Sequence, residues 1–502
     1  MATGRGRNSE VEFEARSGRA AVNYQTSKNM RDLKDKAHEL LSRGALLPLV
    51  RWQRAARPSR HAPLRAYREG MRLRERALGW GVEERREWVL RRLRFAVRRA
   101  ARDTDYYGEL FREAGFDPET DFGFDEFARL PVLEREDVRR AGHTLVSRTL
   151  AESDLKKDAT GGSTGEPTEI WLGPEERGWA ESGIEFSMRR AGVPPGTSTG
   201  FLWGHHLDPV ARETRLERFH DFAQNVRWFD CFRLSPEVLE QYHRAFERWR
   251  PACVVAYANA LSSLAEHVLE RGGGRRPGYP RKCFVTGAEK LLPAQRERIE
   301  EAFGRPIHER YGSRDAGLMA FQYEPRRTLD YEVDWANIFV EPETAGEDSA
   351  ILITKLHADG MPLIRYRVGD VGRFPEGSQP GAPSFVLREV IGRVTDRIWL
   401  PDGRWVHGLQ LPHMMKDYPV REFMFTQHAD YSIGLKIVPR NGFGEESRRR
   451  ILATLADNLP DLPVTIELVK DIPRTKANKW RPVVSEVETQ PNGDKEEGSL
   501  EI

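Results

Sequence analysis

The stretch Arg281-Lys-Cys-Phe-Val-Thr-Gly-Ala-Glu289 joins a short apolar run to a turn of small residues that ends in an acid. An apolar run of this length, bounded by turn residues, is typical of a buried strand. A similar run occupies 252–257, and helical patterns follow the two runs at 260–270 and 293–303. Strands that alternate with helices in this way predict an α/β layered domain.

The pattern continues upstream and changes downstream. Further predicted elements of the α/β part are a strand at 199–203 and helices at 175–191 and 236–249. Residues 331–375 lose helical spacing and predict antiparallel strands, for example at 350–354 and 363–367. After residue 392 a short α+β unit follows. Its predicted elements are strands near 396–406, 431–438 and 464–470 and a helix at 445–458.

This pattern predicts an α/β protein with a large multi-layer N-terminal domain and a small, mobile α+β C-terminal domain. The expected boundaries are a disordered N-terminus at 1–30, the large domain at 31–392, the small domain at 393–488 and a disordered tail at 489–502.

Composition limits the class of protein. A chain of 502 residues exceeds one compact core, and 39% hydrophobic with 31% charged residues fits a globular protein. The net charge of +2 argues against a general nucleic-acid binder. Three scattered cysteines predict a reducing, cytoplasmic setting, and no apolar run approaches the about 18 residues of a membrane span.

An arginine-rich helical pattern at 84–102 is open to two interpretations. Its basic side chains could bind RNA, or they could form a solvated face of Glu/Arg pairs, which is the commoner arrangement.

Two segments far apart in the chain carry chemistry. The loop Thr160-Gly-Gly-Ser-Thr-Gly-Glu-Pro167 offers three glycines and three hydroxyls, which together can wrap a phosphate. It lacks the Gly-Lys-Ser/Thr of a Walker loop, and such a loop taken alone is most often a plain turn. Near the C-terminus, Lys479 is a lone basic group in the polar loop Ile472-Pro-Arg-Thr-Lys-Ala-Asn-Lys479.

Four more motifs stand between these two in a fixed order. They are Thr286-Gly-Ala-Glu289, Tyr311-Gly-Ser-Arg-Asp315, Tyr366-Arg-Val-Gly-Asp370 and Gly392-Arg-Val-Thr-Asp396. Each alone suits an ordinary turn or strand end. As an ordered set they resemble the adenylate-forming superfamily of acyl-CoA synthetases, and within it the phenylacetate–CoA ligase-like branch, from about Glu84 to Val487.

The resemblance implies a role for each motif residue. Ser163, Thr164 and Gly165 would hold the β- and γ-phosphates of ATP. Gly287, Ala288 and Glu289 would lie along the adenine, Tyr311 with Gly312 and Ser313 near the base, and Asp370 with Arg393 on the ribose. The implied catalytic residues are Lys479, Thr164 and Asp315, with Asp315 holding Mg²⁺ and Asp396 acting as the hinge.

Aromatic and histidine side chains follow two of the predicted strands. The resemblance places Trp203, His205, His206 and Tyr257 at the pocket for the acid. The paired histidines could alternatively bind a metal, but no further ligand has suitable spacing.

The implied function is ATP-dependent activation of a carboxylic acid, expected to be an aryl acid, as acyl-AMP, followed by transfer to coenzyme A. Alternatives for the acceptor are an amine or a carrier protein, and a more distant one is activation of nitrite for arylamine diazotisation. The non-enzyme alternative is a nucleotide- or RNA-binding scaffold. We expect no nucleic-acid or membrane partner for the enzyme, and the oligomeric state is left open.

Some residues depart from the family's pattern. Gly161 replaces a usual hydroxyl, Glu166 a frequent lysine, Asp315 a glutamate and Asn478 a glycine. An acid beside a polyphosphate is unfavourable unless it faces away or touches Mg²⁺, so these changes bear on the affinity for ATP. The Cys and His residues that suit a structural zinc in some relatives are missing after Tyr311, which predicts no zinc.

Overall fold

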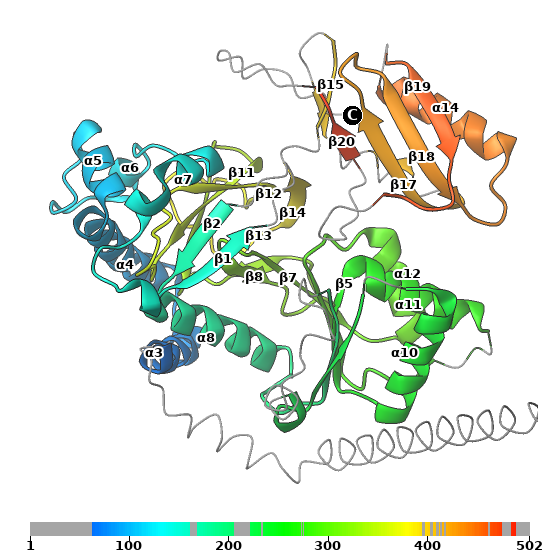
Figure 1. Ribbon diagram of the computed structural model, residues 1–502, viewed down its shortest axis with the longest axis horizontal. Helices are drawn as coiled ribbons and strands as arrows, with labels where there is room; N and C mark the ends of the chain where they lie inside the picture. The colour runs from blue at the N-terminus through cyan, green and yellow to red at the C-terminus, as the bar shows by residue number, and fades with distance from the viewer. Residues whose placement is uncertain are drawn as a thin grey trace, which may run out of the picture.

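The computed structural model describes residues 63–160, 168–204, 221–231, 234–272, 274, 276–393, 397–401, 405–407, 411, 414–415, 418–459, 462–473 and 483–487. Figure 1 shows a large α/β body and a smaller unit, coloured orange to red, which lies at one end of it. The mixed α/β class and the division into a large and a small part agree with the sequence-based prediction. Residues 1–30 and 489–502, predicted to be disordered, lie outside the described residues.

The large body is organised around an eight-stranded sheet with the order β13-β9-β8-β7-β6-β5-β3-β4. Strands β4, β3, β5, β6 and β7 run parallel, and the other neighbours are antiparallel. The strands are β3 (Thr199–Leu202), β4 (Val226–Phe229), β5 (Cys253–Tyr257), β6 (Cys283–Gly287), β7 (Ile307–Ser313), β8 (Gly317–Phe321), β9 (Tyr331–Val333) and β13 (Val386–Leu387).

Helices cover both faces of the parallel strands (Figure 1). They are α8 (Pro174–Arg190) on one side and α10 (Pro236–Trp249), α11 (Ala258–Glu270) and α12 (Pro293–Phe303) on the other. Alternate side chains of β5 therefore enter different cores: Val254 packs with α10–α12, and Val255 packs towards the end of α8. Burial on both faces explains why the strands read as continuous apolar runs.

A second, four-stranded antiparallel sheet has the order β10-β11-β12-β14. It packs with the N-terminal helices in the largest hydrophobic core. Its strands are β10 (Ile338–Pro342), β11 (Asp348–Lys355), β12 (Tyr366–Arg373) and β14 (Glu389–Arg393). The N-terminal elements are α3 (Pro63–Arg76), α4 (Val82–Asp103), α5 (Asp105–Glu113), α6 (Phe124–Phe127) and α7 (Arg135–Ala141), followed by the hairpin of β1 (Lys156–Thr160) and β2 (Thr168–Leu172).

The small unit has its own hydrophobic core, built from residues between Ile398 and Val483. A four-stranded sheet of order β19-β18-β17-β20 packs there with one helix and a short hairpin. The elements are β15 (Arg397–Trp399), β16 (Trp405–His407), β17 (Val420–Gln427), β18 (Ile433–Pro439), α14 (Glu445–Asn458), β19 (Val464–Leu468) and β20 (Val483–Ser485). Among the helices of the described residues, none combines the length and apolar character needed to cross a bilayer.

The structure corrects three details of the predicted elements. The strand expected at 363–367 begins only at Tyr366, because Arg365 adopts a left-handed backbone with φ of 50°. β17 and β20 were not predicted as strands. β20 is only three residues long and pairs with β17 across more than fifty residues of chain, so no local sequence pattern predicts it.

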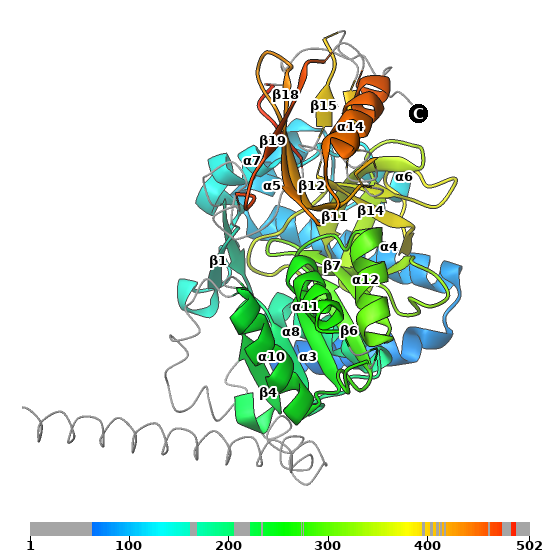
Figure 2. The same cartoon turned by 90° about the vertical axis from the view of Figure 1, so that its right-hand side faces the viewer.

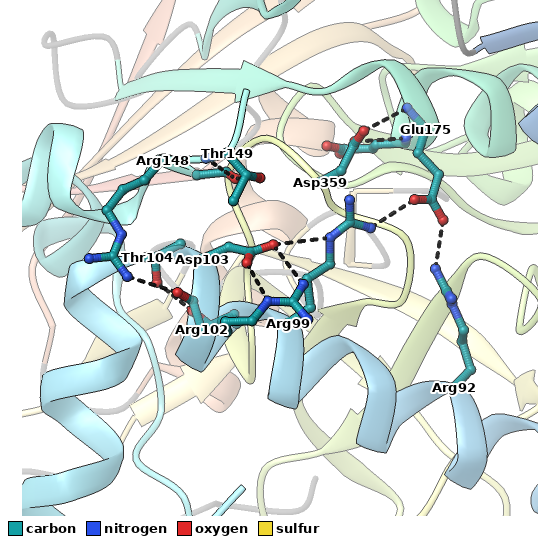
Figure 3. Close-up of polar contacts among 12 residues, drawn as sticks. Arg92, Arg99, Arg102, Asp103, Thr104, Arg148, Thr149, Glu175 and Asp359 are labelled. Carbon is teal, nitrogen blue, oxygen red and sulfur yellow. Dashed lines mark hydrogen bonds and ion pairs between the residues drawn. The ribbon is translucent and has the colours of Figure 1, made fainter. Parts of the chain in front are cut away.

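The arginine-rich helix α4 uses several of its charges inside the protein (Figure 3). Arg92 and Arg99 both contact the Glu175 carboxylate, at 2.8 and 2.7 Å. Arg94 and Arg98 donate to the backbone carbonyls of Phe122 and Pro118. The interpretation of this helix as a solvated face of Glu/Arg pairs therefore holds for only part of it, since these arginines join α4 to its neighbours.

Glu175 stands at the start of α8, where Asp359 also accepts hydrogen bonds from the Glu175 and Glu176 backbone N–H groups (Figure 3). Burial on its own would raise the pKa of Glu175. Hydrogen bonds from His357 and Arg99 and the charges of Arg92 and Arg99 outweigh it and lower the pKa to about 2. The carboxylate thus stays ionised and holds two guanidinium groups at the helix N-terminus.

We expect Glu175→Gln to lower the free energy of unfolding by about 2 kcal/mol at pH 7, because two arginines lose a shared counter-charge. The folded carboxyl has a lower pKa than the usual 4.5, so its stabilisation is complete above that pH and is lost as the pH falls towards 2. Urea denaturation of both proteins from pH 3 to pH 8 measures this. Glu87→Gln, in an exposed pair with Arg91, is the control, and a stability difference that does not shrink at low pH would contradict the assignment.

Candidate active site

The candidate site lies at the carboxyl ends of the parallel strands, where open α/β sheets bind their ligands. β5 ends at Tyr257 and β6 ends at Gly287, so the predicted adenine segment follows directly. Ala288 turns the chain with a φ of 67°. The Glu289 carboxylate then accepts a hydrogen bond of 3.1 Å from the Asn259 N–H at the start of α11, where the helix dipole favours an acid.

Tyr311 and Asp370 come from different sheets and meet at this edge. The Tyr311 hydroxyl donates to Asp370 Oδ2 at 2.8 Å. In the β12–β14 pairing, Asp370 lies directly opposite Arg393, whose backbone alone is described. The strand register thus brings together the two residues that the sequence assigned to a ribose.

Gly312 is required by a close approach of two strands. A Cβ at this position would lie 2.3 Å from the Gly317 carbonyl oxygen, which no side chain tolerates. The β7–β8 ladder is irregular at the same place, between Tyr311 and Gly312. Beyond it, the Ser313 hydroxyl accepts a hydrogen bond of 3.1 Å from the Ala316 N–H and so shapes the turn that carries Asp315.

Asp315 is buried in a polar contact of its own. Its Oδ2 accepts a hydrogen bond of 2.9 Å from Tyr366 Oη and lies 3.8 Å from Arg135 Nη2. Burial raises the pKa of Tyr366, which therefore stays a neutral donor. A carboxylate that is 2% exposed and faces a guanidinium does not suit direct Mg²⁺ binding in this arrangement. Asp315 as a Mg²⁺ ligand stays a prediction.

The predicted phosphate loop closes the β1–β2 hairpin. Thr160 and Thr168 pair at the hairpin end, and Ser163, Thr164 and Gly165 between them lie outside the described residues. Arg314, beside Asp315, approaches Asp158 on β1 with a distance of 3.9 Å between Nη1 and Oδ1. The stem of the loop therefore stands next to the Tyr-Gly turn.

An aromatic pair marks the other side of the site. The rings of Trp203 and Tyr257 meet edge to face with centroids 4.4 Å apart. His205 and His206 lie outside the described residues. The Arg310 guanidinium carbon lies 4.7 Å from the centre of the Trp203 ring. Sequence reasoning missed Arg310, although its place between Glu309 and Tyr311 on a strand puts it on the opposite face from Glu309.

The small unit lies beside the large body (Figures 1 and 2). A cavity of about 1530 Å³ is lined by both parts, including Tyr257 and Glu289 from the large body and Tyr418 and Arg421 from the small one. Arg440 Nη2 approaches Glu266 Oε1 at 3.2 Å across it.

The predicted hinge and the catalytic lysine are not described directly. Asp396 falls at 394–396, between the end of β14 and the start of β15, and Lys479 falls at 474–482, just before β20. Both lie outside the described residues. Among the described residues, no group of three or more His, Cys, Asp and Glu side chains is arranged to hold a metal, and the absence of zinc stays a prediction.

Comparison with known proteins agrees with this architecture. No protein-family model matches the chain. Protein CapK of Staphylococcus aureus is 19% identical over 77% of this chain and 86% of its own length. Phenylacetate-coenzyme A ligases are 22% identical in Escherichia coli, over 59% of this chain and 69% of the relative, and 22% identical in Pseudomonas putida, over 63% and 72%.

A solved structure has the same fold. A 2-hydroxyisobutyryl-CoA ligase in the postadenylation state, in complex with R3-HIB-AMP, superposes with a TM-score of 0.64 and 19% identity over 81% of this chain and 90% of that one. The chain thus has the fold of this acyl-CoA ligase and is similar in sequence to phenylacetate-coenzyme A ligases.

Proposed function

We propose that this protein is an AMP-forming ligase that activates a carboxylic acid with ATP and then transfers the acyl group to coenzyme A. The observation that carries the proposal is the hydrogen bond between Tyr311 and Asp370, made beside the Gly287–Glu289 segment. It joins, from two sheets, an aromatic ring suited to a base and a carboxylate suited to a ribose. Arg393 stands in register with that carboxylate.

In the first half-reaction, a carboxylate oxygen of the acid attacks the α-phosphorus of ATP. The new bond is the P–O bond of acyl-AMP, and the bond to the bridging oxygen breaks, so that pyrophosphate leaves with the bond electrons. Lys479 would place its ammonium against the charge that builds on the phosphate oxygens, while Ser163, Thr164 and Gly165 would bind the departing phosphates. Mg²⁺, which relatives of this kind are expected to use, would neutralise the polyphosphate.

In the second half-reaction, the thiol of coenzyme A would lose its proton, attack the acyl carbon and displace AMP. We propose that the small domain, 393–488, pivots at Asp396 relative to the large domain, 31–392, so that Lys479 leaves before the acceptor enters. The separate core of the small unit and its cleft support this division. Closure around acyl-AMP would exclude water from a reactive ester.

The acceptor and the cellular setting belong to the same proposal. Coenzyme A is the acceptor that the relatives' names support. The alternative acceptors are an amine and a carrier-protein thiol, and the more distant alternative is activation of nitrite in place of a carboxylic acid. All three cysteines are free and buried, which fits a reducing compartment such as the cytoplasm.

The test is exchange of labelled pyrophosphate into ATP with the full-length protein across a panel of aryl acids, aliphatic acids and nitrite. We expect exchange with at least one carboxylic acid, and thioester formation when coenzyme A is added. Amines and carrier proteins are then offered to the same acyl-AMP. No exchange with any acid, together with salt-sensitive RNA binding, would instead support the scaffold alternative.

A further inference from the structure

Arg310 is a positive charge at the acyl side of the site that the proposed reaction does not use. It lies on β7 between Glu309, which bonds to Arg296 on the α12 side, and Tyr311. Its own side chain projects to the other face, where its guanidinium carbon lies 4.7 Å from the centre of the Trp203 ring. Trp203 in turn contacts Tyr257 at the end of β5.

Gly287 leaves the space that the Arg310 side chain occupies. A Cβ on Gly287 would lie 2.8 Å from Arg310 Cγ and 2.9 Å from Nε. The glycine of the predicted adenine segment therefore serves a second purpose, because any larger residue would displace the arginine from Trp203. The glycine contacts the aliphatic stem and the ring contacts the face of the guanidinium, so the N–H groups at the guanidinium edge are left to bind a partner.

Within the part of the chain that the structure describes, no carboxylate forms an ion pair or hydrogen bond with Arg310. Three other arginines with little exposure each have one: Arg74 bonds to Asp334, Arg296 to Glu309 and Arg365 to Glu341. The two titratable groups with which Arg310 interacts are Tyr257 and Cys253.

Neither neighbour supplies a negative charge. Burial raises the pKa of Tyr257 to about 12, and a hydrogen bond with Cys283 together with burial raises the pKa of Cys253 well above its usual value. Both are neutral at pH 7. Desolvation lowers the pKa of Arg310 itself, but a guanidinium stays protonated in proteins.

The Arg310 residue is partly buried, and a partly desolvated charge without a counter-ion is unfavourable, which contact with the Trp203 ring offsets only in part. The cost is recovered when a ligand supplies the missing anion. A planar guanidinium binds a carboxylate through two parallel hydrogen bonds, which also fixes the orientation of the ligand.

We propose that the acid activated by this enzyme is a dicarboxylic acid, whose distal carboxylate binds Arg310 while the other carboxylate reacts with ATP. This inference rests on the proposed adenylation and names its substrate class. Arg310 is then a specificity-determining residue of the acyl pocket, and Trp203 and Gly287 position it.

The experiment compares acids with the same skeleton and one or two carboxylates. Suitable pairs are benzoate and terephthalate, phenylacetate and 4-carboxyphenylacetate, and valerate and glutarate. Pyrophosphate exchange gives kcat/KM for each acid with the wild type, Arg310→Met, Arg310→Lys and the exposed control Arg327→Met. We expect the wild type to prefer the dicarboxylate of its best pair by about 100-fold, since a monocarboxylate leaves the partly buried guanidinium without a counter-ion.

Arg310→Met should lower that ratio by about 100-fold, Arg310→Lys should lower it less, and Arg327→Met should keep it. Far-UV circular dichroism and ATP binding show that each variant is folded. The inference is overturned if the wild type prefers monocarboxylates, if the ratio survives Arg310→Met, or if that variant impairs all acids equally while raising the KM for ATP. Absence of exchange with every acid would instead overturn the proposed function itself.

Discussion

Lys479→Ala is expected to release pyrophosphate about 100- to 1,000-fold more slowly than the wild type at saturating acid and ATP. The reason is electrostatic: charge that develops on the phosphate oxygens in the transition state loses a positioned ammonium. Because such an interaction is stronger in the transition state than in the ground state, kcat should fall far more than the affinity for ATP.

Lys479 lies outside the described residues, between Ile472 and the start of β20 at Val483. The side chains that pack in this part of the core, Ile472 and Val483, are not altered by the substitution. The stability of Lys479→Ala should therefore match that of the wild type. Lys470→Ala, at an exposed position of the same domain, is the matched control.

Continuous assay of pyrophosphate measures the adenylation half-reaction, and supplying synthetic acyl-AMP with coenzyme A measures the second. We expect the second rate to stay within a few-fold, because the proposed domain movement removes Lys479 before transfer. A Lys479→Ala enzyme that releases pyrophosphate at close to the normal rate would rule out the assignment.

Asp370→Ala is expected to raise the KM for ATP by about 100-fold. The carboxylate is placed to accept hydrogen bonds from two ribose hydroxyls, and hydrogen bonds to a charged group contribute about 1.5–3 kcal/mol each. It is also the acceptor for Tyr311, so its removal frees that ring from its position beside the adenine segment.

Two companion variants separate these effects. Tyr311→Phe keeps the ring and removes only the hydroxyl donor, and we expect a smaller rise, of about 5-fold. Asp348→Ala removes an exposed carboxylate that pairs with Arg373 on the same strand as Asp370, and ATP use should not change. Initial rates at varied ATP measure all three. If the KM for ATP of Asp370→Ala stays within threefold of the wild type, Asp370 does not bind the ribose.

The contacts of Asp315 in the structure differ from the Mg²⁺ binding that its motif implies. In the structure its carboxylate is held by Tyr366 and lies near Arg135, which comes from α7. The residue thus ties the Tyr-Gly turn to the N-terminal helices. Metal coordination would require these contacts to open. No local pattern indicates them, because Arg135 lies more than 170 residues before Asp315 and Tyr366 about 50 residues after it.

Local patterns in the chain determined the elements of the large domain. The helices at α8, α10, α11 and α12 and the strands at β3, β5 and β6 fall where apolar periodicity and turn residues put them. The ordered motifs also predicted the likeness to phenylacetate–CoA ligases that the comparisons find. Periodicity is a property of neighbouring residues, so the sequence carries it in full.

Only the tertiary structure decided which groups meet. The contact of Tyr311 with Asp370 needs two sheets to pack at one edge, and the pairing of Asp370 with Arg393 needs the β12–β14 register. Among the described residues Arg310 has no carboxylate partner, and this depends on which distant segments pack around it, which no local pattern encodes. Long-range packing sets the charge and neighbours of a side chain, and for this protein those neighbours bear on the acid it takes.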